Sequence, residues 1–188
     1  VDQAAPTADA GSGFTKTCVT NASGGTIGAS GSSGNSYSWN NGAGSSATAS
    51  VNPSSTTTYT LTVTDNSNGC TATDDVTVTV NTTPPSAAAG NDFTKTCTSN
   101  ANGTQVGQSS VAGQTFSWSP SSGLNSPSSA TTLANPSATT TYTLTVTQNN
   151  NGCTNTDDVV VTVDQATPAA DAGSDFTKTC VTNPTGGT

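Results

Sequence analysis

The residues best suited to covalent chemistry in this chain are its five cysteines, and three of them end the same five-residue word. Phe-Thr-Lys-Thr-Cys occurs three times, ending at Cys18, Cys97 and Cys180. The other two, Cys70 and Cys153, each follow a glycine and lie between these words. The words are 79 and then 83 residues apart. Self-similarity at a nearly fixed period indicates a tandem repeat, so each copy is expected to do the same chemistry.

Each complete repeat carries two cysteines, which is the number that one disulfide needs. The simplest pairing joins Cys18 to Cys70 and Cys97 to Cys153, and the partner of Cys180 then lies outside these 188 residues. Such a bridge would stabilise a small module by roughly 4 kcal/mol in the chain-entropy model, and it requires an oxidising compartment. Free cysteines buried as small core residues are the alternative. Zinc is disfavoured, because the chain has no His and no CxxC spacing.

Lysine is placed as regularly as cysteine. The only three bases of the chain sit two residues before the cysteine of each word, and each complete repeat also carries a pair of Asp residues four residues after Gly-Cys. If the disulfide joins the two strands, each lysine would lie near its Asp pair: Lys16 near Asp74 or Asp75, and Lys95 near Asp157 or Asp158. One interpretation is a surface salt bridge or a solvated lysine. The other is an intramolecular isopeptide bond from lysine to Asn or Asp, which needs a buried lysine and a neutral carboxyl as proton shuttle.

The composition excludes several classes of function. The net charge is −8, with no His, Arg, Glu or Met. Nucleic acid and anionic membrane surfaces are disfavoured, because both need clusters of Lys and Arg. No apolar run is long enough for a membrane-spanning helix, so direct membrane insertion is not expected. An enzyme is not expected either, since a nucleophile and base would have to be built from Ser, Asp or Lys.

Calcium is the one metal hypothesis that the acidic residues allow. All 11 acids are Asp, and Asp9, Asp65 and Asp92 fall in expected loops, where oxygen ligands could be supplied. No spacing of the EF-hand or RTX type is present. Solubilising surface charge is the alternative, and no cofactor is expected.

The strands that would position these residues follow a period-2 pattern. Residues 59–64 and 76–80 alternate Thr with large apolar side chains, which predicts strands with one core face and one Thr-coated face. Residues 36–39 and 115–118 predict another strand, and residues 48–51 and 131–133 a shorter one. The aromatic side chains expected in the core are Trp39, Tyr59, Trp118 and Tyr142. Several short strands separated by turn signals predict an all-β fold, a β-sandwich.

The repeat period divides the chain. We expect the tail of a preceding repeat at residues 1–6, complete repeats at 7–83 and 84–166, and the start of a truncated third repeat at 167–188. The second repeat has four extra residues between Trp118 and Tyr142, within a turn-rich segment at residues 119–127. Because insertions are tolerated in surface loops, this segment is expected to be a loop.

The order of these words resembles a known family. Ala-Gly, a lone Cys, an aromatic-Ser-Trp strand, Asn-Pro-Ser, Thr-Thr-Tyr-Thr-Leu-Thr-Val-Thr, Gly-Cys and Asp-Asp-Val together look like the immunoglobulin-like, PKD-like repeats of very large Bacteroidota surface proteins, including gliding-motility adhesins. The resemblance covers nearly the whole chain. It implies tandem sandwiches of about seven strands each, displayed at the bacterial cell surface, where the repeats act as a stalk.

The sequence therefore predicts a structural segment of an extracellular filament or adhesin stalk, whose partners are neighbouring repeats and copies of itself. Two alternatives stay open. The chain could be an adhesin module whose loops bind surface glycans or another ligand, with the insertion as the place of diversity. It could also be a fibre subunit that assembles by strand exchange, with the first residues completing the sheet of a neighbour.

Overall fold

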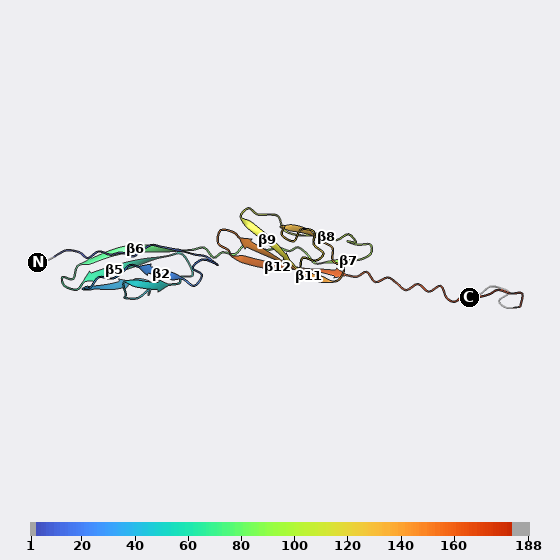
Figure 1. The fold of residues 1–188 in the computed structure, drawn as a ribbon, viewed down its shortest axis with the longest axis horizontal. Helices are drawn as coiled ribbons and strands as arrows, with labels where there is room; N and C mark the ends of the chain where they lie inside the picture. Colours follow the sequence, from blue (N-terminus) through green and yellow to red (C-terminus); the bar gives the residue numbers. More distant parts are fainter. Residues whose placement is uncertain (1–2, 182–188) are drawn as a thin grey trace.

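The computed structural model of the protein describes residues 3–181, which form two β-sandwich modules arranged end to end (Figure 1). Module 1 contains strands β1 to β6, and module 2 contains strands β7 to β12. The strands of module 1 are β1 (Thr15–Lys16), β2 (Gly25–Gly28), β3 (Asn35–Trp39), β4 (Thr48–Val51), β5 (Thr57–Asp65) and β6 (Thr71–Val80). Those of module 2 are β7 (Phe93–Lys95), β8 (Thr104–Gly107), β9 (Gln114–Ser119), β10 (Thr131–Ala134), β11 (Thr140–Gln148) and β12 (Thr154–Val163).

Both modules have the same sheets. A four-stranded sheet runs in the order β1-β6-β5-β3 in module 1 and β7-β12-β11-β9 in module 2, and a two-stranded sheet pairs β2 with β4 or β8 with β10. The all-β, immunoglobulin-like sandwich is confirmed. Six strands are assigned in each module rather than seven. The extended segment before β1 accepts one backbone hydrogen bond from β2, in which Gly28 N donates to Ala10 O at 2.8 Å. In module 2, Gly107 N donates to Ala89 O in the same way.

The alternation of Thr with apolar residues builds the cores as expected. In β5 the side chains of Tyr59, Leu61 and Val63 are buried, while the Thr residues between them are only partly covered. Each buried tryptophan also finds a partner for its indole N–H, as a desolvated donor requires: Trp39 Nε1 donates to Ser46 O and Trp118 Nε1 to Ser129 O. All four predicted core aromatics, Trp39, Tyr59, Trp118 and Tyr142, lie in the two cores.

The four-residue insertion of module 2 lies between β9 and β10, as the sequence predicts. Leu124 from this loop packs against the core of module 2, and Tyr142 donates its hydroxyl hydrogen to Ser122 O at 2.7 Å. The insertion therefore adds a covering loop without altering the strands.

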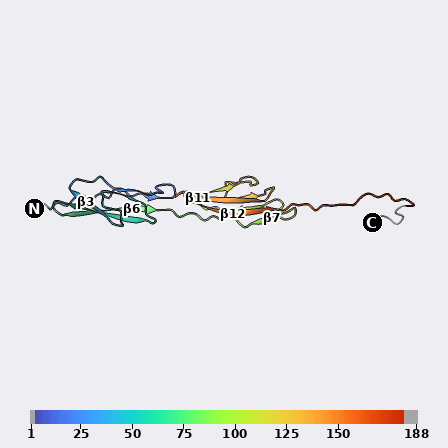
Figure 2. The ribbon, with the colours of Figure 1, turned by 90° about the horizontal axis from the view of Figure 1, so that it is seen from below.

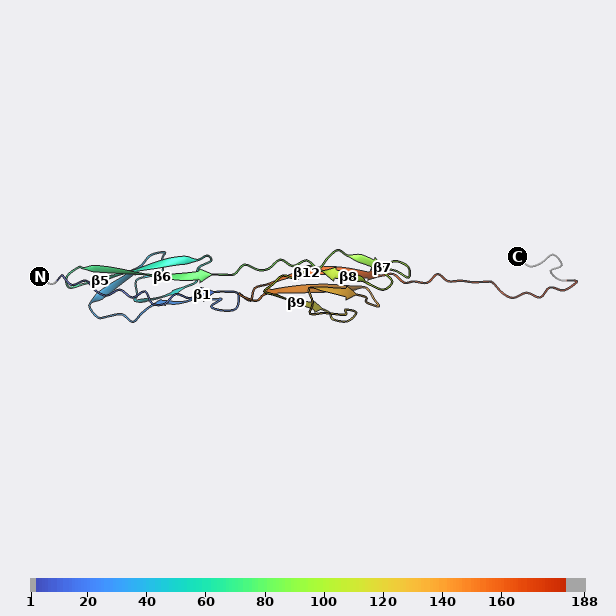
Figure 3. The same ribbon diagram turned by 90° about the horizontal axis from the view of Figure 1, so that it is seen from above.

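One strand pairing determines where the cysteines lie. The short strand β1 is parallel to β6, with Thr15 opposite Thr79 and Lys16 opposite Val80. In module 2, β7 and β12 are parallel in the same way, with Lys95 opposite Val163. The opening word therefore ends beside the end of β6, and β6 leads into the linker to module 2. The two views turned by 90° show this end-to-end path (Figure 2; Figure 3).

Residues 164–181 leave module 2 as an exposed, extended segment. The third word, which ends at Cys180, forms no strand within this segment. In the two complete copies the corresponding strands, β1 and β7, pair only with the last strands of their modules, β6 and β12. The 188 residues hold no third copy of this last strand for the third word to pair with. Within the described residues no helix is long and apolar enough to cross a membrane.

Candidate functional site

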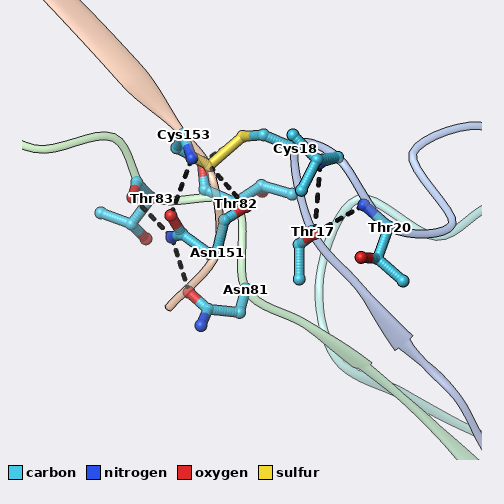
Figure 4. The surroundings of a disulfide bond; sticks show 9 residues. Thr17, Cys18, Thr20, Asn81, Thr82, Thr83, Asn151 and Cys153 are labelled. Carbon is cyan, nitrogen blue, oxygen red and sulfur yellow. Dashed lines mark hydrogen bonds between the residues drawn. A yellow bond between two sulfur atoms is a disulfide. The ribbon is translucent and has the colours of Figure 1, made fainter. Parts of the chain in front are cut away.

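The joint between the modules carries the covalent chemistry of the described chain. Cys18 of module 1 is bonded to Cys153 of module 2, across 135 residues of sequence and with 5.1 Å between the two Cα atoms (Figure 4). Cys70, Cys97 and Cys180 are free. The pairings Cys18–Cys70 and Cys97–Cys153 expected from the sequence are therefore wrong.

The parallel pairing of β1 with β6 explains the correction. Cys18 Sγ lies 3.9 Å from Thr82 O, just after β6 ends, whereas Cys70 directly precedes the start of β6. Twelve residues of extended chain separate Thr82 from Cys70, which is roughly 40 Å at about 3.3 Å per residue. A disulfide needs Cα atoms within about 7 Å. The hairpin loop between β11 and β12 reaches the end of module 1 instead, and it supplies Cys153.

Asn151 is the polar centre of the joint (Figure 4). Its Nδ2 donates to Asn81 Oδ1 and to Thr83 O, both at 3.0 Å, and its Oδ1 accepts from Cys153 N at 2.9 Å. The side chain is only 3% exposed. Because a buried amide must be satisfied by partners in fixed positions, Asn151 fixes the linker against the hairpin loop of module 2.

Backbone and apolar contacts complete the joint. Cys18 N donates to Asn151 O at 3.2 Å, and Asn155 Nδ2 donates to Pro85 O at 3.1 Å. Val19 lies over Gly152 so closely that a Cβ on this glycine would come within 2.6 Å of a Val19 methyl group. The joint is thus built from the opening-word loop, the linker and the β11–β12 loop together.

Energetically, the disulfide is the strongest single restraint at this joint. Closing a loop of 135 residues contributes about 5 kcal/mol in the chain-entropy model. Because it links two modules rather than two strands of one module, it also limits rotation about the linker. The arrangement can therefore hold the two sandwiches at a fixed relative orientation.

The lysines do not meet the Asp residues with which the sequence paired them. Lys16 is opposite Val80, six residues along β6 from Asp74, which is roughly 20 Å. Lys16 Nζ instead donates to Asn52 Oδ1 at 2.5 Å and Pro53 O at 3.0 Å. Lys95 Nζ repeats this arrangement with Asn135 Oδ1 at 2.5 Å and Pro136 O at 2.9 Å, and its side chain is 7% exposed.

The carboxylates paired with these lysines in the sequence have other roles. Asp74 and Asp157 accept hydrogen bonds from Ala10 N and Ala89 N, and they hold the extended segment before the opening word. Asp75 and Asp158 are exposed neighbours on the same strands. The Lys–Asp pairing is therefore wrong. The isopeptide bond stays a hypothesis, now with Asn52 and Asn135 as the amides in contact with lysine.

The Asp residues considered for calcium lie in three different segments, Asp9 and Asp92 before β1 and β7 and Asp65 at the end of β5, and each accepts a hydrogen bond from a backbone N–H. Asp9 accepts from Gly11 N, Asp92 from Val160 N, and Asp65 from both the N–H and the hydroxyl of Ser67. The hydrogen bonds from Ser67 lower the pKa of Asp65. Among residues 3–181, no group of three or more His, Cys, Asp or Glu residues could hold a metal ion.

Module 2 also carries an open hollow of about 870 Å³. Hydroxyl and amide groups line it together with the ring of Phe116, and Gln114 Oε1 is buried there without a hydrogen-bond partner. The residue of module 1 that corresponds to Gln114 is Asn35, whose side chain is one methylene shorter.

Asn151, Val19 and Gly152 are functional residues of the joint that the sequence does not predict. A signal for two of them is present, because Asn-Gly-Cys occurs at the same place in both repeats, before β6 and before β12. The word marks a loop in which the Asn side chain accepts a hydrogen bond from the cysteine N–H two residues later. The sequence motif does not tell which other cysteine this loop contacts, because that depends on how the two modules are arranged.

Comparison with known proteins finds similarity in solved structures only. No protein-family model matches the sequence, and no curated protein matches it. An I-band fragment of titin aligns over 82% of this chain at 12% identity, with a TM-score of 0.41. Drosophila N-cadherin EC1-4 aligns over 82% at 13% identity, with a TM-score of 0.40, and the extracellular domains 3-5 of Drosophila OTK align over 82% at 14% identity, with a TM-score of 0.41. The aligned part spans 63%, 47% and 60% of these three chains.

Proposed function

We propose that this chain is a structural segment of an extracellular filament or adhesin stalk at a bacterial cell surface, in which immunoglobulin-like modules are joined end to end. The observation that carries the proposal is the disulfide from Cys18 to Cys153, because it restrains the arrangement of modules rather than the interior of one module. A bond of this kind holds consecutive modules in one relative orientation, which suits a load-bearing or length-setting element.

The surroundings of the disulfide and the composition support the same role. A disulfide persists in oxidising, extracellular compartments. Three Lys and no Arg among 188 residues leave few sites for trypsin-like proteases, and the Thr-rich outer strand faces suit an exposed structure. The sequence resemblance to repeats of large Bacteroidota surface proteins points to the same setting.

Immuno-electron microscopy of intact source cells tests the proposal. Antibodies against the folded chain are expected to label fibres or surface projections without prior permeabilisation, at intervals along their length. Labelling that appears only after the cells are opened would overturn the extracellular role. As a matched control, antibodies against a cytoplasmic protein of the same cells must stay excluded from the intact sample.

A further inference from the structure

The two outer ends of the pair of modules carry the free cysteines Cys70 and Cys97, which correspond to the two cysteines bonded at the joint. Cys97 follows β7 at the end of module 2 that points away from module 1, in the position that Cys18 has in module 1. Cys70 precedes β6 at the other outer end, in the position that Cys153 has in module 2. Both thiols are free.

The loop of Cys97 has the same internal bonds as the loop of Cys18. Thr96 Oγ1 accepts from Ser99 N at 2.7 Å, where Thr17 Oγ1 accepts from Thr20 N at 2.8 Å. Cys97 Sγ lies 3.9 Å from Gln165 O, and Cys18 Sγ lies 3.9 Å from Thr82 O at the corresponding place. The Cys97 loop therefore has the bonded conformation while its thiol is still free.

The loop of Cys70 likewise matches the loop of Cys153. Cys70 N donates to Asn68 Oδ1 at 2.8 Å, as Cys153 N donates to Asn151 Oδ1 at 2.9 Å. Asn68 Nδ2 donates to Ala4 O at 3.1 Å, as Asn151 Nδ2 donates to Thr83 O at 3.0 Å. The segment that enters module 1 is thus held as the linker is held at the joint.

The loops of Cys70 and Cys153 differ in how much other residues bury them. A Cβ on Gly152 would strike Val19, whereas a Cβ on Gly69 would have no atom within 4 Å. Cys153 is 1% exposed, whereas Cys70 is only half-buried. The outer face of module 1 therefore lacks the contacts that an opening-word loop supplies at the joint.

We propose that these two ends are complementary halves of the same joint, so that Cys97 of one chain forms a disulfide with Cys70 of a second copy, head to tail. The bonded pair Cys18–Cys153 is the internal example of this contact. The proposal deepens the proposed function by naming the partner at each end, and it needs that function only for the oxidising compartment.

The covalent step is a thiol–disulfide exchange. A low-molecular-weight or protein disulfide of the compartment first forms a mixed disulfide with one of the two thiols and releases one thiol. The thiolate of the other cysteine then attacks the sulfur that belongs to the protein and expels the second thiol. The oxidant gains two electrons and two protons, and one S–S bond joins the two chains.

The path of the chain is compatible with this contact. In the joint the linker passes Thr82 and Thr83, which correspond to Gln165 and Ala166 at the far end of module 2. Gln165 stays beside Cys97, and residues 166–181 are all exposed, so the chain can turn away from the contact after Gln165. In the second copy, Ala4 already lies where Thr83 lies at the joint.

Two variants of the full chain test the proposal when they are oxidised with glutathione. The first is Cys70→Ser with Cys180→Ser, which keeps Cys97. The second is Cys97→Ser with Cys180→Ser, which keeps Cys70. Each is expected to stay monomeric alone, while a mixture of the two gives a disulfide-linked heterodimer on a non-reducing gel. Mass spectrometry of its peptides should show Cys97 bonded to Cys70.

A matched pair of glycine variants tests the face itself. Gly69→Leu in the Cys70-bearing variant places a side chain where Val19 lies at the joint, and is expected to slow heterodimer formation at least tenfold. Gly42→Leu has nearly the same backbone strain, with φ of +72° against +74°, and should leave the rate unchanged.

Homodimers through Cys97 alone or Cys70 alone, formed as readily as the heterodimer, would overturn the proposal. So would a rate that Gly69→Leu does not change. These outcomes are separate from the fate of the proposed function. A chain found only inside cells would remove the oxidising compartment, yet the heterodimer result in solution would stand.

Discussion

At the scale of single residues, Asn151 does more for the joint than its size suggests. One buried amide group satisfies the linker carbonyl of Thr83, the side chain of Asn81 and the N–H of Cys153. The disulfide can bring two modules together, but it leaves rotation about its own bonds. The hydrogen bonds of the Asn151 amide restrict this rotation and so fix the relative orientation of the two modules.

Asn151→Ala should therefore lower the stability of module 2 even with the disulfide intact. Groups that are buried and lose their partner cost about 1–3 kcal/mol, and urea unfolding of the oxidised chain would measure the loss. Asn68→Ala is the matched control, because it removes the corresponding amide at an end that is only half-buried. An equal loss in both variants would contradict a role of Asn151 in the joint.

Lys95 provides a second residue-scale prediction. Its ammonium group ties β7 to the turn after β10 through Asn135 and Pro136. Lys95→Met should destabilise module 2 by about 1–3 kcal/mol, because two oxygens lose their donor. Lys16→Met makes the same change in module 1, where the lysine is less buried, and should cost less. Thermal unfolding followed by circular dichroism would compare the two.

The intact mass of the chain, measured after its disulfide has been reduced, tests the isopeptide hypothesis. Both lysines touch an Asn amide, but among residues 3–181 their ammonium groups contact amide and backbone oxygens only, with no carboxyl to shuttle a proton. We therefore expect the full mass of the sequence, with no loss of ammonia. A loss of one ammonia per module would establish the bond instead.

At the scale of elements, the close approach of β8 to β10 depends on glycine. Gly107 has φ of +106°, and a Cβ there would lie 2.1 Å from Ala130 O on the segment that leads into β10. Gly113 has φ of +78° but an open neighbourhood, with its nearest contact at 3.7 Å. Both glycines have a positive φ, but only Gly107 lies directly against another backbone segment.

Gly113→Ala should cost about 1–2 kcal/mol, the strain of a side chain in left-handed backbone. Gly107→Ala should cost more, because the Ala130 carbonyl must also move and the two-stranded sheet of β8 and β10 opens. Urea unfolding of the two variants would give the difference in free energy. Equal losses would mean that the two-stranded sheet tolerates the displacement.

The elements also explain which features the sequence could predict. The strands that alternate Thr with Val, Leu or Tyr have an unambiguous period, so residues 59–64 and 76–80 are correctly predicted as parts of β5 and β6. The first half of β6, from Thr71, lacks that alternation of Thr with large apolar side chains and is missed. The strands β1 and β7 have two or three residues and no period to read. Nothing in a Thr-Lys dipeptide tells a parallel from an antiparallel neighbour. The disulfide and lysine predictions assumed that the opening word lies beside the start of the last strand, and both were wrong for that reason.

At the scale of the whole molecule, the disulfide changes which part of the chain carries tension. A force applied at the two ends passes along the chain to Cys18, crosses the S–S bond, and continues from Cys153. Residues 19–152 lie inside the covalent loop, so unfolding cannot lengthen the molecule through them. Most of both sandwiches is thereby shielded from extension, which suits a stalk that must keep its length under load.

Single-molecule force spectroscopy can measure this shielding. The oxidised chain should reach a contour length shorter than that of the reduced chain by roughly 450 Å, from the 135-residue separation at about 3.4 Å per residue. The substitution Cys153→Ser decides between pairings. With the joint disulfide it releases the entire hidden length at once. With one disulfide inside each module it would release only about half, because the loop from Cys18 to Cys70 would stay closed. Release of only half the length would show that each disulfide lies within one module. The joint would then be held by its hydrogen bonds alone.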